Sequence, residues 1–279
     1  MDLYKTHSSL LKASFLLTLT CGNGYADSLA TIPEQSPGSM YIGIFAGAGQ
    51  STKGDINQFG MSFYTEAKGG PLAVNAFGQT KEKNLGFIGG HIGYQFSDRS
   101  INSSWGITPA IELEGYYIAD RNIEGSDINS ETTRIDEHQF LLTYPTKTSV
   151  FLTNFVLNFN LANQSKYHPY IGIGIGTAIH SITNAVSEQT APAEPGVNHY
   201  NGGPSDTKAT FAAQTKLGFN YQLKDKLKMF VEYKLLYVTN NSFKFGSTVY
   251  PGHNATSTWL VDLGAHYNNM ASIGLNYTL

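Results

Sequence analysis

The sequence predicts an all-β protein, an eight-stranded antiparallel transmembrane up-and-down β-barrel, with a ten-stranded barrel as the alternative. Three observations predict it. The chain of 279 residues has only 14 % charged residues and contains 29 Gly, 17 Tyr and 16 Phe. Its strand-like segments alternate apolar and polar residues, and the gaps between these segments are alternately long and short. This combination is typical of strands that present one apolar face to lipid.

The N-terminus, residues 1–26, has the features of a signal peptide. Lys5 and Lys12 make it basic, an apolar run follows at 13–20, and Gly-Tyr-Ala at 24–26 supplies the small residues that signal peptidase requires. We therefore expect export and cleavage after Ala26, followed by a short periplasmic segment at 27–40. The only cysteine, Cys21, lies within this peptide. The mature chain would then have no disulfide.

Eight segments have the length and alternation of barrel strands. They run ~10 to 17 residues each, more than the ~9–11 that cross a bilayer at a tilt near 45°. The predicted strands are 41–50, 85–96, 105–118, 148–161, 168–181, 207–223, 228–239 and a last strand that ends at Leu279.

The gaps between these strands alternate in length. The short gaps are 97–104, 162–167 and 224–227, and the long gaps are 51–84, 119–147, 182–206 and 240–257. Bacterial barrels have tight periplasmic turns and longer extracellular loops. We therefore expect residues 41–279 to form the barrel and the four long gaps to be extracellular loops.

The alternation also predicts which face of each strand is apolar. In 170–176, Ile171, Ile173 and Ile175 point to one side and three glycines to the other. Charged residues in the predicted strands fall opposite the apolar face, together with Gly, Asn and Gln, which suits a closed lumen. Aromatic residues near the short turns are expected at a membrane interface: Tyr94, Phe96, Trp105, Tyr170, Phe219, Tyr221 and Tyr277.

Two stretches resemble a known family. The end, ASIGLNYTL at 271–279, resembles the closing strand of outer-membrane barrels, although Leu279 stands where Phe is usual. The start, YIGIFAGAG at 41–49, is similar to the opening strand of opacity-type surface antigens and of the OmpA barrel domain. The resemblance implies a surface-exposed barrel of a Gram-negative outer membrane, inserted by the assembly machinery through its C-terminal strand. It implies no particular ligand.

Three segments leave the strand number open. Residues 259–267 alternate well by themselves, so they either begin a long eighth strand or pair above the membrane. Residues 56–66 and 71–79 have the pattern of a further hairpin within the first long gap. Adding two such segments to the ring gives the ten-stranded alternative.

Six ionisable residues are predicted to form a structural network in the lumen. An isolated buried charge is very costly, so carboxylates and lysines there must pair. We predict that the network fills the barrel, and a gate or narrow ion path is the alternative, since eight strands leave room for little more than side chains. The residues are His91, Glu112, Glu114, Lys216, Glu232 and Lys234.

Neither a catalytic residue, a cofactor nor a metal site is expected. His180 and Ser181 pair a base with a nucleophile, but adjacent strand residues point to opposite faces. The eight histidines show no metal-site spacing such as His-Glu-x-x-His. The acidic gap 119–147 is interpreted as a solvated loop, with contact to divalent cations or a host receptor as the alternative. Residues 188–196, which contain Pro192 and Pro195, are expected to be extended rather than part of a sheet.

The first hypothesis for function is a structural and surface-interaction role, like that of an adhesin or antigen. A small channel for ions or apolar solutes and a lipid-modifying enzyme are the alternatives. The expected partners are outer-membrane lipid and lipopolysaccharide, the assembly machinery, and host surface molecules that meet the loops. A formal net charge of −3 and the lack of a basic stripe argue against nucleic acid.

Overall fold

The structure is a computed structural model that describes residues 38–102, 104–131, 134, 136–161 and 166–279. These residues form strands and a single short 3-10 turn at Glu66–Lys68. Across these ranges, no helix has the length and apolar character needed to span a membrane. The predicted signal peptide and most of the segment 27–40 lie outside the described residues.

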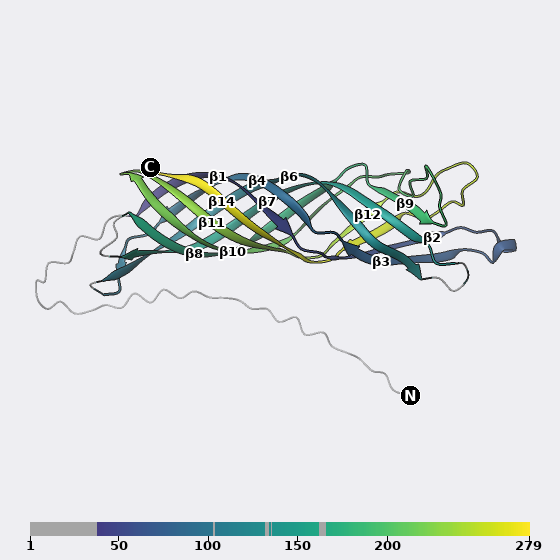
Figure 1. The fold of residues 1–279 in the computed structure, drawn as a ribbon, viewed down its shortest axis with the longest axis horizontal. Coiled ribbons are helices and arrows are strands. Elements are labelled where there is room, and N and C mark those ends of the chain that lie inside the picture. The colour runs from purple at the N-terminus through teal and green to yellow at the C-terminus, as the bar shows by residue number, and fades with distance from the viewer. Residues whose placement is uncertain (1–37, 103, 132–133, 135, 162–165) are drawn as a thin grey trace, which may run out of the picture. The chain divides into compact units, whose positions relative to one another are not determined.

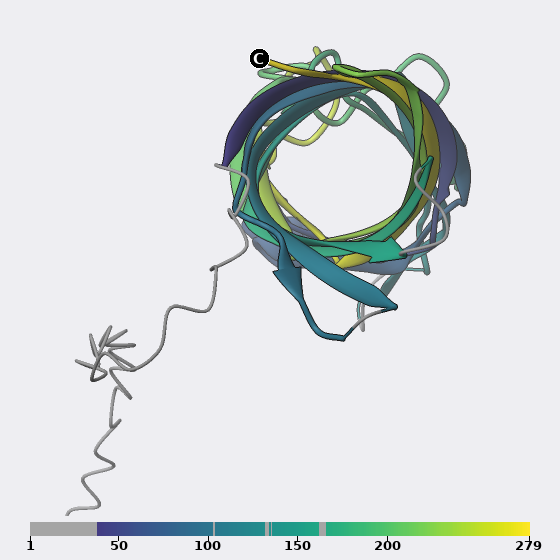
Figure 2. The same ribbon diagram turned by 90° about the vertical axis from the view of Figure 1, so that its left-hand side faces the viewer.

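Eight strands form a closed antiparallel ring (Figure 2). The first strand pairs with both the second strand of the ring and the last strand, which closes the barrel. The eight-stranded prediction is thus confirmed, and the ten-stranded alternative is wrong. In order around the ring, the strands are β1 (Ser39–Ser51), β4 (Lys83–Gln95), β6 (Trp105–Glu131), β7 (Gln139–Leu161), β8 (Tyr167–Ile182), β10 (Asp206–Lys224), β11 (Leu227–Val238) and β14 (His266–Thr278).

Five more strands lie outside the ring, at the end where the long gaps were predicted (right-hand side of Figure 1). Strand β3 pairs with the extended end of β6 and β9 with that of β7, which gives the order β12-β13-β2-β3-β6-β7-β9. A further short strand, β5 (Arg99–Ser100), pairs with β6 near a short turn. The five strands are β2 (Asp55–Ser62), β3 (Leu72–Thr80), β9 (Val186–Ala191), β12 (Asn241–Phe245) and β13 (Trp259–Leu263).

These strands test several predictions about the long gaps. The hairpin expected at 56–66 and 71–79 is confirmed, because β2 pairs with β3. Residues 259–267 divide between β13, which pairs with β2 and β12, and the start of β14. The expectation that 188–196 avoids the sheet is wrong for its first residues. Strand β9 continues to Ala191, because the first proline, which lacks an N–H donor, comes only at Pro192.

Strands β6 and β7 are much longer than predicted. The predicted boundaries, Ile118 and Thr148, are wrong because both strands continue beyond the ring and remain paired with each other. In β6, a register shift between Ile118 and Arg121 reverses which residues point inward and which point outward. An extra residue in one strand moves every later side chain to the other face, so the pattern is lost although the strand is not.

The described part of the chain has two apolar cores. The first fills the ring with inward side chains such as Phe45, Tyr116 and Phe230. The second lies in what we call the long-loop layer, residues 52–82, 119–131, 139–147, 182–205 and 240–265. Its buried residues are Ile56, Val74, Ala76, Ile128, Phe140, Leu142, Tyr144, Ile182, Ala185, Tyr200, Phe243, Phe245, Trp259, Val261 and Leu263.

Inward glycines make room for the large rings of the first core. A Cβ atom at Gly218 would lie 2.4 Å from the ring of Tyr170, and one at Gly274 would lie 2.4 Å from the ring of Phe230. The expected position of Tyr170 at the outer interface is therefore wrong. Its ring covers Gly218 inside the barrel, and its hydroxyl donates to Glu232 over 2.9 Å.

The outward face of the ring is apolar. Ile44, Ile173 and Leu217 are 69 %, 60 % and 57 % exposed, although they lie in the middle of regular strands. All eight strands contribute to this surface, which we call the apolar belt. Its aliphatic and Phe members are Ile42, Ile44, Ile88, Ile92, Ile111, Leu113, Phe151, Phe155, Ile171, Ile173, Ile175, Phe211, Leu217, Phe219, Val231, Ile273 and Leu275.

Candidate functional site

The lumen contains a cluster of buried charges. Lys216 forms ion pairs with Glu112, with Glu114 at 3.2 Å and with Glu232 at 3.5 Å. Lys234 pairs with Glu114 and, at 3.1 Å, with Glu232. The side chains of all five residues are at most 6 % exposed. The structure thus brings together five of the six residues predicted for the lumen network.

Neutral side chains give the carboxylates additional hydrogen bonds. Tyr41 donates to Glu112 over 2.7 Å, and Asn154 donates to Glu114 over 2.9 Å. The ammonium of Lys234 also lies 3.9 Å from the centre of the Phe45 ring, a cation–π distance. The three carboxylates therefore have more donors than the two lysines alone provide.

His91, the sixth predicted residue, lies at the edge of this cluster. One of its nitrogens lies within 4.8 Å of carboxylate oxygens of Glu112 and Glu114. Its Nε2 atom, however, hydrogen bonds with the side-chain oxygen of Asn276 over 2.7 Å. His91 is thus a neighbour of the ion-paired network with a polar partner of its own.

The lumen retains little free space beside these charges. The cavity lined by Glu112, Lys216 and Glu232 has a volume of about 20 Å³, room for about one water molecule. The open centre of the ribbon in Figure 2 is filled by side chains of the first core and of the charge network. The role of the network as a structural plug remains a prediction.

His180 and Ser181 lie on opposite faces of β8, as strand geometry requires. His180 hydrogen bonds with Thr148 over 3.0 Å in the interior, whereas Ser181 accepts a hydrogen bond from Thr207 at the exposed surface. The histidine therefore does not reach the serine hydroxyl, and the pair does not form a base and nucleophile.

Two of the acidic residues of 119–147, Asp120 and Glu124, form ion pairs. Glu124 forms ion pairs with Lys83 at 2.7 Å and Lys81 at 3.4 Å, and Asp120 pairs with Lys147 at 3.7 Å. The hydrogen bonds from the lysines lower the pKa of Glu124. These ion pairs link β6 with its neighbours.

A second polar site lies in the long-loop layer. It is a cavity of about 150 Å³ lined by side chains from β2, β3, β7, β9 and the loops after β9 and β12. The lining combines a buried apolar wall of Val74, Phe140 and Trp259 with polar groups. This cavity is thus a partly open, mostly polar pocket with an apolar wall on one side.

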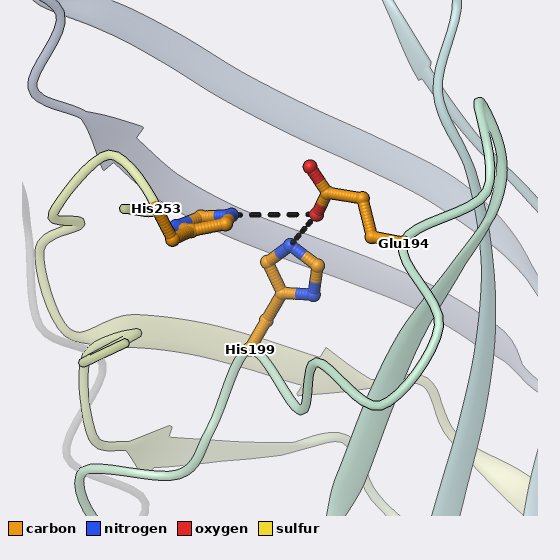
Figure 3. Close-up of side chains that lie close together, drawn as sticks. All are labelled: Glu194, His199 and His253. Atoms are coloured by element: carbon orange, nitrogen blue, oxygen red, sulfur yellow. Dashed lines mark ion pairs between the residues drawn. The ribbon is translucent and has the colours of Figure 1, made fainter. Parts of the chain in front are cut away.

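Three of the polar groups converge on one point (Figure 3). The Oε2 atom of Glu194 lies 3.4 Å from Nε2 of His199 and 3.3 Å from Nε2 of His253. Glu194 and His199 come from the segment after β9, and His253 comes from the segment between β12 and β13. The two loops are thus joined by one cluster of side chains.

The buried, aromatic surroundings of His199 disfavour the charged form of its ring. Its side chain is 5 % exposed, and Phe140 and Trp259 pack against its ring with centroid separations of 5.6 and 6.2 Å. Burial lowers the pKa of His199, because the charged ring loses its hydration. The carbonyl of Ser187 and the carboxylate of Glu194 act in the opposite sense, and the net direction is downward.

The sequence contained little signal for this cluster. Metal-binding and catalytic motifs are recognisable in a sequence as short local spacings, whereas Glu194 and His253 are far apart in the chain. The structure nevertheless brings His199 and His253 together, although the eight histidines show no metal-site spacing in the sequence. A long-loop layer with its own core brings them together, and that core was not predicted.

Comparisons with known proteins give a fold likeness only. The scan against family models finds no match, and the search of curated proteins finds none. Similar solved structures include Neisserial surface protein A (11 % identity, 87 % of this chain, 99 % of that chain, TM-score 0.37). The outer membrane protease OmpT from Escherichia coli matches with 11 % identity over 91 % of this chain and 99 % of that chain, TM-score 0.37. The outer membrane protein OprG from Pseudomonas aeruginosa matches with 10 % identity over 88 % of this chain and 97 % of that chain, TM-score 0.34. These scores are too low to assign a family or a role.

Proposed function

We propose that this chain is an outer-membrane β-barrel surface protein with a structural and surface-interaction role. One observation carries the proposal: the ring is apolar outside and charged inside. A water-soluble barrel has the opposite arrangement, because exposed apolar area favours aggregation and buried charge is costly. Lipid around the apolar belt accounts for both features at once.

The two ends of the apolar belt support this placement. Aromatic pairs lie near the short turns, where Tyr94 packs on Phe96 and Tyr167 packs on Tyr221, both with centroid separations of 5.1 Å. Rings with a polar tip favour the interface between lipid and water. At the other end of the ring, Tyr237 packs on Tyr267, also at 5.1 Å.

Beyond the ring, the outward face becomes polar. Exposed residues on the outer strands include Gln79, Asn122, Glu188 and Lys244, and most large apolar residues of the long-loop layer are turned into its own core, although Phe77, Leu260 and a few others are exposed. This change of character fits strands that leave the membrane and enter water. We therefore place the long-loop layer at the cell surface and the short turns in the periplasm.

The long-loop layer gives the protein a folded surface. Its strands and its core hold the connecting segments in place, and loops positioned by a rigid scaffold are where binding sites commonly lie. This supports contact with lipopolysaccharide or host surface molecules. The filled lumen, with its cavity of about 20 Å³, favours a surface role over a channel.

Labelling of single cysteines tests this proposal. The chain after Ala26 contains no cysteine, so each introduced thiol reports alone. Glu188→Cys and Lys244→Cys lie in the long-loop layer, and Asp225→Cys lies in a short turn. With a membrane-impermeant maleimide on intact Gram-negative cells, we expect the first two to react and the third to react only after lysis.

Heat-modifiable migration on gels gives an independent check, because folded membrane barrels resist detergent until they are boiled. If Asp225→Cys is labelled on intact cells, the short turns face the cell exterior and the proposed orientation of the barrel is wrong. Recovery of the mature chain as a monomer in water without detergent would refute the membrane placement altogether.

A further inference from the structure

The cluster of Glu194, His199 and His253 presents three acceptor atoms to one point. The Nδ1 atom of His199 lies 3.0 Å from the carbonyl oxygen of Ser187, and Nδ1 of His253 lies 2.6 Å from that of Asn254. A carbonyl oxygen only accepts hydrogen bonds, so each Nδ1 must hold the proton. In a neutral imidazole, Nε2 then has a free lone pair.

The lone pairs of both Nε2 atoms therefore face the carboxylate of Glu194. The Oε2 atom of Glu194 is buried and has no hydrogen-bond partner among the residues that the structure describes, although both nitrogens lie 3.3–3.4 Å away. Three acceptors with no proton between them repel one another. A buried carboxylate oxygen without a donor is costly, and a cation held between the three atoms would remove that cost.

The separations of these atoms match those of a metal coordination sphere. Two ligand atoms that each lie ~2.05 Å from a zinc ion at the tetrahedral angle are ~3.3 Å from each other. The two separations from Glu194 are 3.4 and 3.3 Å, and the three ligand atoms all lie within 4.8 Å of one another. Backbone carbonyls that hold the Nδ1 protons are also the usual second partners of metal-binding histidines.

We propose that Glu194, His199 and His253 bind a divalent transition-metal ion, and that zinc is the ion they fit best. Two imidazoles and one carboxylate form a donor set that zinc uses in proteins. Calcium and magnesium prefer oxygen ligands throughout, and the two imidazole nitrogens argue against them. Such an ion links the segment after β9 to the segment between β12 and β13.

A fourth ligand position is available in the same cavity. His138 lines it, and its Nδ1 atom is buried without a hydrogen-bond partner in the described part of the chain. The cavity of about 150 Å³ also has room for an ion and several water molecules. Either His138 or a water molecule completes the four ligands.

Zinc binding to the full mature barrel in detergent micelles tests the proposal. The protein is purified through a tag without histidine, stripped with a chelator, and titrated with zinc chloride by isothermal titration calorimetry. We expect one zinc per chain, confirmed by elemental analysis after dialysis. Cobalt(II) at the same site should give the strong visible absorption of a tetrahedral complex.

Ligand variants identify the site. His199→Ala, His253→Ala and Glu194→Gln should each weaken zinc binding at least tenfold. Glu194→Gln keeps the size of the side chain, and Glu194 is partly exposed, so this variant should fold even if the histidine variants do not. His168→Ala, at the short-turn end of β8, is the matched control and should bind zinc like the unaltered protein.

Gel migration of unboiled samples verifies that each variant has folded. Folded variants that lose zinc binding support the proposal. It is overturned if the unaltered protein binds no zinc, or if folded His199→Ala and Glu194→Gln bind it as tightly as the unaltered protein does.

Discussion

Lys234 of β11 and Glu114 of β6 form an ion pair across the full width of the barrel. In the ring order β1-β4-β6-β7-β8-β10-β11-β14, four steps separate β6 from β11 in either direction. The pair therefore connects opposite walls, and Glu232 at 3.1 Å shares the same ammonium. Contacts of this kind join strands that share no backbone hydrogen bonds.

Replacing Lys234 should destabilise the barrel strongly. In Lys234→Met, the carboxylates of Glu114 and Glu232 lose a cation while both remain buried, which typically costs about 3–5 kcal/mol. The free energy of unfolding is measured by urea titration in lipid vesicles, with folded and unfolded forms separated on a gel. Lys208→Met is the control, because Lys208 pairs with Asp206 while 40 % exposed, and such pairs contribute about 1 kcal/mol or less. Equal effects of the two substitutions would contradict a structural role for the lumen network.

The filled lumen predicts that the barrel does not conduct ions. The ion-paired layer and the aromatic rings of the first core leave only about 20 Å³ beside Lys216 and Glu112. In planar bilayers, the purified protein should show no steady conductance steps, under conditions in which a general porin in the same lipid conducts. Reproducible steps that disappear after boiling of the sample would mean that the network opens.

The apolar belt predicts a difference between two exposed leucines. Leu217 is 57 % exposed in the middle of β10, and Leu260 is 43 % exposed on β13 in the long-loop layer. Leu217→Arg should cost about 2–4 kcal/mol in lipid vesicles, because arginine near the middle of the bilayer is poorly solvated. Leu260→Arg should change the free energy of unfolding by about 0.5 kcal/mol or less, since surface changes in water rarely matter more. In a water-soluble protein both substitutions would be mild, and that result would reject the membrane placement.

The sequence was sufficient to predict the ring because one physical rule repeats along it. Ile171, Ile173 and Ile175 alternate with glycines, and their exposed positions in the structure follow directly from a period of two. Lys216 and Glu232 could be placed inside by the same rule. Each inference needed only the local pattern of one strand.

The rest depended on features that no local pattern contains. The register shift after Ile118 reverses the alternation of β6, so its extension looked like a polar loop. Tyr170 is an exception, because the alternation that turns Ile171 outward already places its ring inside, over Gly218. The convergence of Glu194 with His253 depends on the folding of two distant segments onto one core. Periodicity thus predicts the faces of a strand, but not the packing between loops.

Phe245 should be essential for the long-loop layer but not for the ring. It is 1 % exposed and packs on Tyr144 and Tyr200, with ring centroids 5.7 and 4.7 Å away. Phe245→Ala should remove about 3–5 kcal/mol from the packing of this layer, through lost apolar contact and the cavity left behind. Because the ring has a separate core, we expect a protease to cut the loops of this variant readily while the ring remains folded.

Limited proteolysis of the barrel in lipid vesicles, followed by gel migration without boiling, separates these two effects. Phe77→Ala is the matched control, because Phe77 lies in β3 of the same layer but is 39 % exposed. The loops of the Phe77→Ala variant should resist the protease as well as those of the unaltered protein do. If Phe245→Ala instead unfolds the ring together with the loops, the two cores act as one cooperative unit, and the long-loop layer is part of what holds the barrel closed.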